Sequence, residues 1–249
     1  MGDSWELAIP SYRRHLLVGE RTLRQAADCG VPRERIHLFV TPEEHRLYEQ
    51  TVDHGLVGEI LPLSTAQDIA ATRNAIVDYF GTGEVVSMDD DLNGMQQLAG
   101  DRLVPMNDWP LLFETGFKLA RENHAFLWGV YPVQNAFFMR NKPRVGLALC
   151  LTGCHGQILQ GRACERVSLP VKEDYERSLQ HFMADGAVVR LEWVTMDTRV
   201  YKGPGGFQGI RTVEHSKFAV DELMRRFPGL VKSKKAKTGF PECRLVSAG

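Results

Sequence analysis

Apolar and polar positions alternate along the first hundred residues in a pattern typical of strands that are each followed by a helix. Short apolar runs predict strands over residues 5–10, 35–40, 58–63 and 84–88. Apolar residues at helical spacing predict helices over residues 20–30, 41–55 and 68–83. The helix over residues 41–55 begins with a Thr-Pro pair, and the helix over residues 68–83 ends at a glycine. This alternation predicts an α/β fold with a mostly parallel central sheet and helices on both faces.

The second half of the chain is richer in strand patterns. β-Branched and aromatic residues are enriched over residues 125–133, 145–159 and 186–198, whereas residues 108–124 and 169–186 have helical patterns. No internal repeat, low-complexity tract or Pro/Ser-rich linker interrupts the sequence. We therefore expect one domain over residues 1–249, with two halves that meet near residue 100.

Composition limits the class of protein. The chain has 249 residues, of which 43% are hydrophobic, and this is enough for a large core. No window reaches the roughly 18 apolar residues of a membrane span, and the N-terminus lacks a basic segment before an apolar run. The five cysteines are an odd number without disulfide-framework spacing. These features predict a soluble, cytoplasmic protein without a membrane partner.

Charge is nearly balanced over the whole chain but not along it. The formal net charge is −1, so general binding to polyanions is not predicted. A local basic cluster near the C-terminus comprises Lys232, Lys234, Lys235 and Lys237. It is equally consistent with a phosphate-binding surface and with a solvated loop.

Three consecutive aspartates, Asp89, Asp90 and Asp91, follow the predicted strand over residues 84–88. Ligands of open α/β sheets bind at the carboxyl ends of the strands. Mg²⁺ and Mn²⁺ commonly use one or two protein carboxylates while substrate phosphates complete the coordination shell. The sequence has no P-loop or dinucleotide-binding glycine pattern. A metal-bridged diphosphate site is therefore favoured over a solvated acidic turn.

A second acidic pair, Glu173 and Asp174, lies at the start of the helix predicted within residues 169–186. A carboxylate there is able to take a proton from an attacking hydroxyl group. Acids are also common in the first turn of a helix because they interact favourably with its dipole. The pair is thus a candidate catalytic site with a purely structural alternative.

A zinc site built from Cys150, Cys154, His155 and Cys164 is disfavoured. Cys150 falls within an apolar run, and the spacing matches no common zinc site. The cysteines also lack a context that would make them nucleophiles.

Five segments in this order carry a resemblance to a known family: "LAIPSYRR", "TRNAIVDYF", "VVSMDDDL", "VKEDYERSLQHFMADGAVVRLEWVTMDTRVYKGPGGFQ" and "KSKKAKTGFPECRLV". Together they resemble the TET-associated DNA glycosyltransferases of bacteriophages, which are relatives of the base J-associated glucosyltransferases. The resemblance covers nearly the whole chain. It implies a glycosyltransferase A-type fold with a nucleotide-sugar-binding half over about residues 1–100 and an acceptor-binding and catalytic half over about residues 101–249.

The resemblance also implies a reaction. A sugar would pass from a nucleotide diphosphate sugar, expected to be a UDP-sugar, to the hydroxyl of 5-hydroxymethylcytosine in DNA. Mn²⁺ or Mg²⁺ is the implied cofactor, and the cytoplasm of a host cell is the implied location. The acceptor base would be reached by extrusion from the duplex or in a single strand, and its 5-substituent already projects into the major groove.

Residue roles follow from the same resemblance. The phosphate-bridging acids match Asp89 and Asp91, and the implied catalytic pair is Glu173 and Asp174. With Asp174 as the base, transfer would be inverting. The implied donor contacts are Ser11, Arg13, Arg73, Asn74, Asp89 and Asp90. His215 is the best-placed candidate for the metal-ligating histidine that is common in this fold. The implied DNA contacts are Lys217, Lys232, Lys234, Lys235 and Lys237.

Two alternatives remain at this point. A DNA-binding relative without activity would have no physical need for acids at both places, so the intact acids count against it. A transferase with a protein, lipid or small glycan acceptor would use the same donor chemistry. The absence of an apolar anchor pattern weakens the lipid version, and the basic cluster favours a polyanionic acceptor.

Overall fold

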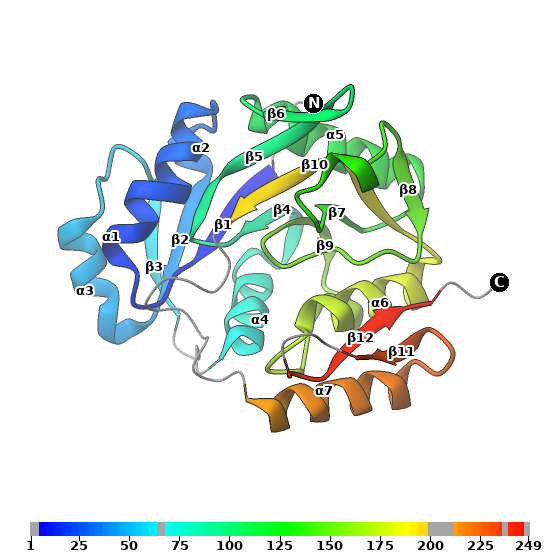
Figure 1. Ribbon diagram of the computed structural model, residues 1–249. Coiled ribbons are helices and arrows are strands. Elements are labelled where there is room, and N and C mark those ends of the chain that lie inside the picture. Colours follow the sequence, from blue (N-terminus) through cyan, green and yellow to red (C-terminus); the bar gives the residue numbers. More distant parts are fainter. Residues whose placement is uncertain (1–4, 64–67, 199–211, 236–238, 247–249) are drawn as a thin grey trace.

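The computed structural model describes residues 5–63, 68–198, 212–235 and 239–246, and a large mixed sheet forms its centre (Figure 1). The strand order is β3-β2-β1-β4-β9-β7-β10-β5-β6, with β8 paired to β10, and β11 and β12 form a separate hairpin. The strands are β1 (Trp5–Pro10), β2 (Ile36–Val40), β3 (Glu59–Pro62), β4 (Thr82–Met88), β5 (Leu92–Ala99), β6 (Arg102–Pro105), β7 (Leu127–Tyr131), β8 (Pro143–Gly146), β9 (Cys154–Gln160), β10 (Val188–Thr198), β11 (Val231–Lys234) and β12 (Glu242–Leu245).

The helices alternate with the first four strands and cover the sheet further along the chain. The α-helices are α1 (His15–Val18), α2 (Arg24–Asp28), α3 (Pro42–Thr51), α4 (Ile69–Phe80), α5 (Trp109–Glu122), α6 (Glu173–Asp185) and α7 (Val213–Arg226). A π-helical turn, η1 (Gly19–Leu23), joins α1 to α2, and the short 3₁₀ turns are η2 (Arg33–Arg35), η3 (Ala136–Phe138) and η4 (Ala163–Glu165).

The strand directions place the carboxyl ends of β1, β2, β3, β4, β7 and β10 at the same edge of the sheet. Strands β3, β2, β1 and β4 are mutually parallel. Strand β9 is antiparallel to both of its neighbours, β4 and β7, while β10 is parallel to β7. Consequently β4, β7 and β10 run in the same direction, and the segments that follow them leave the sheet at a shared edge. The expected fold class is confirmed, with the longest run of parallel strands, β3-β2-β1-β4, in the N-terminal half.

Two expectations about strands need correction. Residues 92–105 form the antiparallel hairpin β5–β6, which the hydrophobic pattern did not predict because its inner strand is largely polar. A two-residue turn with Gly100 at φ +65° closes it. The single strand expected over residues 145–159 is divided between β8 and β9, and residues 147–153 between them are not in a strand.

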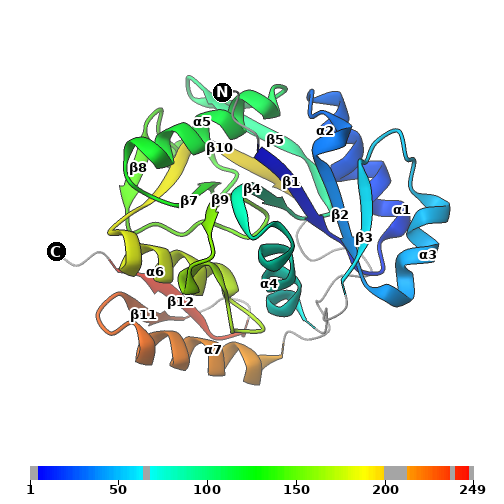
Figure 2. The same cartoon turned by 180° about the vertical axis from the view of Figure 1, so that it is seen from behind.

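Side chains that alternate along β1 pack into separate layers on the two faces of the sheet. Trp5, Leu7 and Ile9 lie on the face covered by α1, α2, α3 and α5, whereas Ala8 packs with α4 on the other face. Helix α6 covers the same face as α4 farther along the sheet, and α7 with the β11–β12 hairpin packs outside α6 (Figure 2). Within the described residues, no helix is long and apolar enough to span a membrane.

The packing around Trp128 supplies a first prediction, on folding stability. A Cβ atom at Gly156 on β9 would overlap the buried Trp128 indole, whereas a Cβ at Gly19 would meet no atom within 4 Å. We expect Gly156→Ala to lower the free energy of unfolding by about 2 kcal/mol or more, as overpacked cores do. Gly19→Ala, at a helical φ of −65°, should be neutral or stabilising by about 0.5 kcal/mol. Urea unfolding measures both, and equal effects would contradict the packing described here.

Candidate active site

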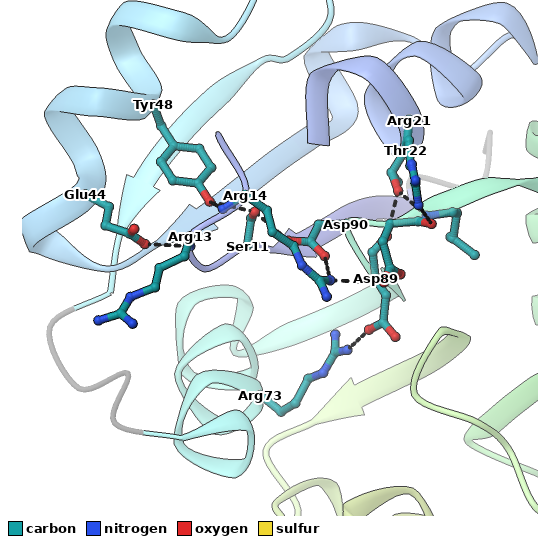
Figure 3. Close-up of polar contacts among 12 residues, drawn as sticks. Ser11, Arg13, Arg14, Arg21, Thr22, Glu44, Tyr48, Arg73, Asp89 and Asp90 are labelled. Atoms are coloured by element: carbon teal, nitrogen blue, oxygen red, sulfur yellow. Dashed lines mark hydrogen bonds and ion pairs between the residues drawn. The ribbon is translucent and has the colours of Figure 1, made fainter. Parts of the chain in front are cut away.

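The three aspartates form the turn between β4 and β5, at the carboxyl end of β4. Figure 3 shows Asp89 and Asp90 with residues that contact them. Thr22 in η1 fixes this turn from the side. Its hydroxyl donates to the Asp89 carbonyl at 2.8 Å and accepts from the Leu92 amide at 3.0 Å. Local π-helical turns are frequent at functional sites, and this one holds a threonine against the acidic turn.

Asp90 points into the protein and anchors the turn. The Ser11 hydroxyl donates to one of its oxygens at 2.6 Å, and Arg14 donates to the other at 2.7 Å. The Tyr48 hydroxyl lies 2.8 Å from that of Ser11 and accepts from the Arg14 amide at 3.1 Å. Burial raises the pKa of Asp90 to about 6, although Arg14 and Ser11 favour its charged form. These contacts make Ser11 and Asp90 supports of the turn, and direct contact of either with a donor stays a prediction.

Asp89 and Asp91 are the members of the triplet that reach solvent. The Asp89 side chain is 38% exposed and its Oδ1 lies 2.6 Å from Nη2 of Arg73. The Asp91 side chain is 20% exposed and shares Arg14 with Asp90, at 3.0 Å. Burial and the negative charge of Asp89 raise the pKa of Asp91. Two carboxylates that repel each other at a solvent-facing turn provide the oxygen ligands and the charge that suit Mg²⁺ or Mn²⁺.

A third protein ligand is not brought to these carboxylates by the described part of the chain. No group of three or more His, Cys, Asp or Glu side chains converges among the described residues. His215 lies in the first turn of α7, where its amide donates to the Thr212 hydroxyl at 3.0 Å. The aspartate pair therefore fits a cation whose shell is completed by substrate phosphates and water, and the role of His215 stays a prediction.

The other expected donor contacts differ in exposure. Arg73 is buried and donates to Ser87 as well as to Asp89. The Asn74 side chain forms two hydrogen bonds with the backbone of Val167. It donates to the Val167 carbonyl at 2.8 Å and accepts from the Val167 amide at 2.9 Å. Arg13 is exposed, and it adopts a left-handed φ of +56° just beyond β1. Arg13 is thus the member of this group whose side chain is open to a ligand.

The second acidic pair begins helix α6, as expected. Glu173 is buried and accepts a hydrogen bond from the Thr152 hydroxyl at 2.8 Å. Asp174 accepts from the Tyr175 amide through Oδ1 at 2.9 Å, whereas no described residue donates to its Oδ2. Burial, followed by the negative charge of Glu173, raises the pKa of Asp174 above its ordinary value. A carboxylate with a free oxygen and a raised pKa is suited to proton transfer near neutral pH.

Residues 152–153, just before β9, join the two acidic clusters. The Asp89 amide donates to the Gly153 carbonyl at 3.2 Å, and Arg73 lies 3.5 Å from the Thr152 carbonyl. The Thr152 hydroxyl binds Glu173 on the other side. Acids that are more than eighty residues apart in the sequence thus meet at one edge of the sheet.

Several residues of the site were missed by sequence reasoning. Arg14 adjoins Arg13, but only the fold shows which of the two turns inward. Thr22 and Thr152 carry no local signal. Arg177 follows Asp174 by three positions on α6, which places both on one side of the helix. Arg177 is 1% exposed, and burial lowers its pKa to about 10.

Two of the three cysteines of the disfavoured zinc set are buried thiols, and the third, Cys164, is half-buried. Cys150 and Cys154 have no exposed surface. Burial raises the pKa of Cys150 to about 12 and raises that of Cys154 further. Both thiols therefore stay protonated, and they pack as small apolar side chains.

The lysines expected to bind DNA lie on the outer layer of the molecule. Lys217 on α7 pairs with Asp221 at 3.0 Å, and both side chains are exposed. Lys232 and Lys234 on β11 and the adjacent Lys235 are exposed, in the hairpin that packs outside α6. Lys237 falls outside the described residues. Their contact with DNA stays a prediction.

The arrangement predicts that two adjacent arginines differ in their effect on stability. Arg14→Met would leave buried Asp90 without its cation, and breaking a buried pair typically costs about 3 kcal/mol. Arg13→Met, at an exposed side chain, should change the free energy of unfolding by less than about 0.5 kcal/mol. Chemical unfolding of the two variants checks this. A similar stability for both would mean that Arg14 does not anchor the turn.

Comparison with known proteins identifies solved structures whose fold is similar to that of this chain. No protein-family model matches the sequence, and no curated protein matches it either. Solved structures do match. TarS of S. aureus is 12% identical over 89% of this chain and 40% of its own, with a TM-score of 0.52.

Two enzymes with bound nucleotides are also similar. A mannosyltransferase from Pyrobaculum calidifontis, in complex with GDP-Man and Mn²⁺, is 13% identical over 95% of this chain and 66% of its own, with a TM-score of 0.54. Glucosyl-3-phosphoglycerate synthase from Mycobacterium tuberculosis, in complex with Mn²⁺, UDP and phosphoglyceric acid, is 10% identical over 100% of this chain and 88% of its own, with a TM-score of 0.53.

At this level of identity the comparison shows the fold, and this chain has the expected glycosyltransferase A-type fold. The chain spans less than half of TarS and about two thirds of the mannosyltransferase.

Proposed function

We propose that this protein is a metal-dependent glycosyltransferase that takes its sugar from a nucleotide diphosphate sugar. The observation that carries the proposal is the meeting of two acidic clusters at the carboxyl edge of the sheet, one with solvent-facing carboxylates at Asp89 and Asp91 and one with Asp174. Ligands bind at this edge in open α/β sheets. The glycosyltransferase A-type fold supports the same donor class.

Asp89 and Asp91 would hold Mn²⁺ or Mg²⁺ against the diphosphate, and the ion would offset the negative charge that develops on the departing nucleotide. Arg73 and Arg14 keep the two carboxylates in place. Exposed Arg13 would bind the nucleotide from the end of β1.

Asp174 would remove the proton from the acceptor hydroxyl as its oxygen attacks the anomeric carbon. The proton goes to Oδ2, the Asp174 oxygen to which no described residue donates. Burial raises the proton affinity of Asp174, and the negative charge of Glu173, which Thr152 fixes, raises it further. A base that activates the acceptor directly would make the transfer inverting.

The proposed donor is a UDP-sugar and the proposed acceptor is 5-hydroxymethylcytosine in DNA. The sequence resemblance to the bacteriophage DNA glycosyltransferases supports this acceptor. The proposed location of the reaction is the cytoplasm of a host cell, which the same resemblance implies.

A second candidate function is transfer to a small acid or a glycan. The observation in its favour is that one structural neighbour, the synthase from M. tuberculosis, is seen with phosphoglyceric acid.

The rate of nucleoside diphosphate release separates these candidates. The purified chain is incubated with Mn²⁺ and a panel of nucleotide sugars, and each acceptor class is added in turn. We expect DNA containing 5-hydroxymethylcytosine to stimulate release, and the same DNA with unmodified cytosine to have no effect. Stimulation by phosphoglyceric acid or a glycan instead would favour the second candidate, and no release with any acceptor would contradict the proposed activity.

A further inference from the structure

The segment between β7 and β8 exposes two adjacent aromatic side chains. Phe137 is 79% exposed and Phe138 is 53% exposed, and their rings lie edge to face with centroids 5.0 Å apart. Both belong to the 3₁₀ turn η3. Scattered apolar residues on a surface need no explanation, but a pair of adjacent exposed aromatic rings is typical of a binding surface.

The same segment is basic and contains no acid. No Asp or Glu occurs between Glu122 and Glu165. Arg140, Lys142 and Arg144 follow the phenylalanines and are exposed. Neither Arg140 nor Lys142 forms an ion pair with an acid in the described part of the chain. Aromatic rings beside cations, on a segment that carries no acid of its own, provide a surface complementary to a nucleic-acid strand.

The fold holds this segment at the edge that carries the active site. It follows β7, whose carboxyl end lies at the same edge as that of β4, where the aspartates begin. The Arg140 amide donates to the Glu192 carbonyl of β10 at 3.1 Å, and Gln134 donates to Gln96 of β5 at 2.8 Å. The segment lies beside β10 (Figure 1). Its backbone is therefore fixed while its rings remain exposed.

We propose that Phe137 and Phe138 form a stacking platform for unpaired bases of the acceptor DNA, and that Arg140 and Lys142 bind the adjoining phosphates. This inference rests on the proposed function and specifies where the acceptor strand lies. Stacking tolerates any base, because every base has an aromatic face. Paired bases in a duplex have these faces covered by their neighbours, so the platform favours a single-stranded or locally unpaired acceptor. The principal DNA contact is then on this segment and not on the lysines of β11.

The test measures the affinity for a single-stranded oligonucleotide containing 5-hydroxymethylcytosine, by fluorescence anisotropy at several salt concentrations and without donor. Phe137→Ala/Phe138→Ala should weaken binding about tenfold or more, because the bases lose the aromatic faces on which they stack. Leu111→Ala on α5 and Phe218→Ala on α7 are matched controls, because both side chains are also more than half exposed. They should leave affinity unchanged.

The proposed phosphate contacts of Arg140 and Lys142 are tested separately, through the salt dependence of DNA affinity. Arg140→Gln/Lys142→Gln should reduce the slope of log affinity against log salt by about 0.7 for each phosphate that is no longer neutralised, the value for single strands. Lys232→Gln/Lys234→Gln on β11 is the matched control and should keep the wild-type slope. Unchanged donor binding, measured by calorimetry, verifies that each variant is folded.

The outcomes distinguish this inference from the function on which it rests. If the wild type glycosylates 5-hydroxymethylcytosine in DNA but the phenylalanine variant binds the strand as tightly as the wild type does, the platform is refuted and the function stands. If the wild type neither binds the strand nor modifies it, both are refuted. Loss of affinity in the phenylalanine variant with retention in the controls supports the platform.

Discussion

Asp89→Asn is expected to abolish most sugar transfer and to remove the metal dependence of donor binding. An amide has the shape of the carboxylate but lacks the charge that offsets a divalent cation. Asp91→Asn should act in the same direction, because Asp91 is the other solvent-facing carboxylate of the turn. Loss of one metal ligand at such a site is expected to lower the transfer rate by about a hundredfold or more, the size of effect seen when a group that stabilises developing charge is removed.

Calorimetric titration of the donor with Mn²⁺ and with a chelator measures this effect. Asp101→Asn is a matched control, since Asp101 is an exposed aspartate in the turn between β5 and β6. Asp89 also pairs with buried Arg73, so the thermal unfolding of each variant is compared with that of the wild type. Metal-dependent donor binding that survives in both Asp89→Asn and Asp91→Asn would remove the metal role from this turn.

Asp174→Asn is expected to lower the transfer rate by about a hundredfold or more while donor affinity stays nearly unchanged. The expected loss is that of a general base, and an amide cannot accept the proton. Glu173→Gln should have a smaller effect, because Glu173 is bound to Thr152 and acts on the acceptor only through Asp174. Asp221→Asn, at an exposed acid of α7, is the matched control.

The pH profile of transfer adds a second readout for Asp174. A base acts in its ionised form, and the pKa of Asp174 is raised by burial and by Glu173. Activity should therefore fall as the pH is lowered, and the fall should occur at a higher pH than for an ordinary aspartate. Glu173→Gln removes one cause of the raised pKa of Asp174, so the pH profile of this variant should shift to lower pH.

The rates of the two variants also identify the base. A larger rate loss in Glu173→Gln than in Asp174→Asn would assign the base to Glu173.

The parallel half of the fold could be predicted because its elements have strong local signals. Strand β1 is buried on both faces, and α3 begins with a Thr-Pro pair, so length and terminal residues were enough to identify them. The hairpin β5–β6 could not be predicted in the same way. Gln96 and Gln97 are polar, so β5 lacks the apolar pattern of a strand. It is held in the sheet by pairing with β10, which lies about a hundred residues later in the sequence.

The acidic clusters of the site could be predicted from their positions after a strand and at a helix start, but their supporting contacts could not. Asp90 and Asp91 are chemically identical and adjacent, and only the packing of β1 and α1 turns Asp90 toward Arg14 and Ser11. The loop residue Thr152 joins the clusters through contacts whose partners are distant in sequence. Such long-range contacts have no local pattern.

Mass spectrometry of the acceptor tests the central claim most directly. A single-stranded oligonucleotide with one 5-hydroxymethylcytosine is incubated with the protein, Mn²⁺ and a panel of nucleotide sugars, then digested to nucleosides. The account predicts that 5-hydroxymethylcytosine gains the mass of one sugar residue, and that this gain is lost with a chelator and in Asp89→Asn. An unchanged nucleoside with every donor, under conditions in which the protein binds a nucleotide sugar, would contradict the DNA acceptor.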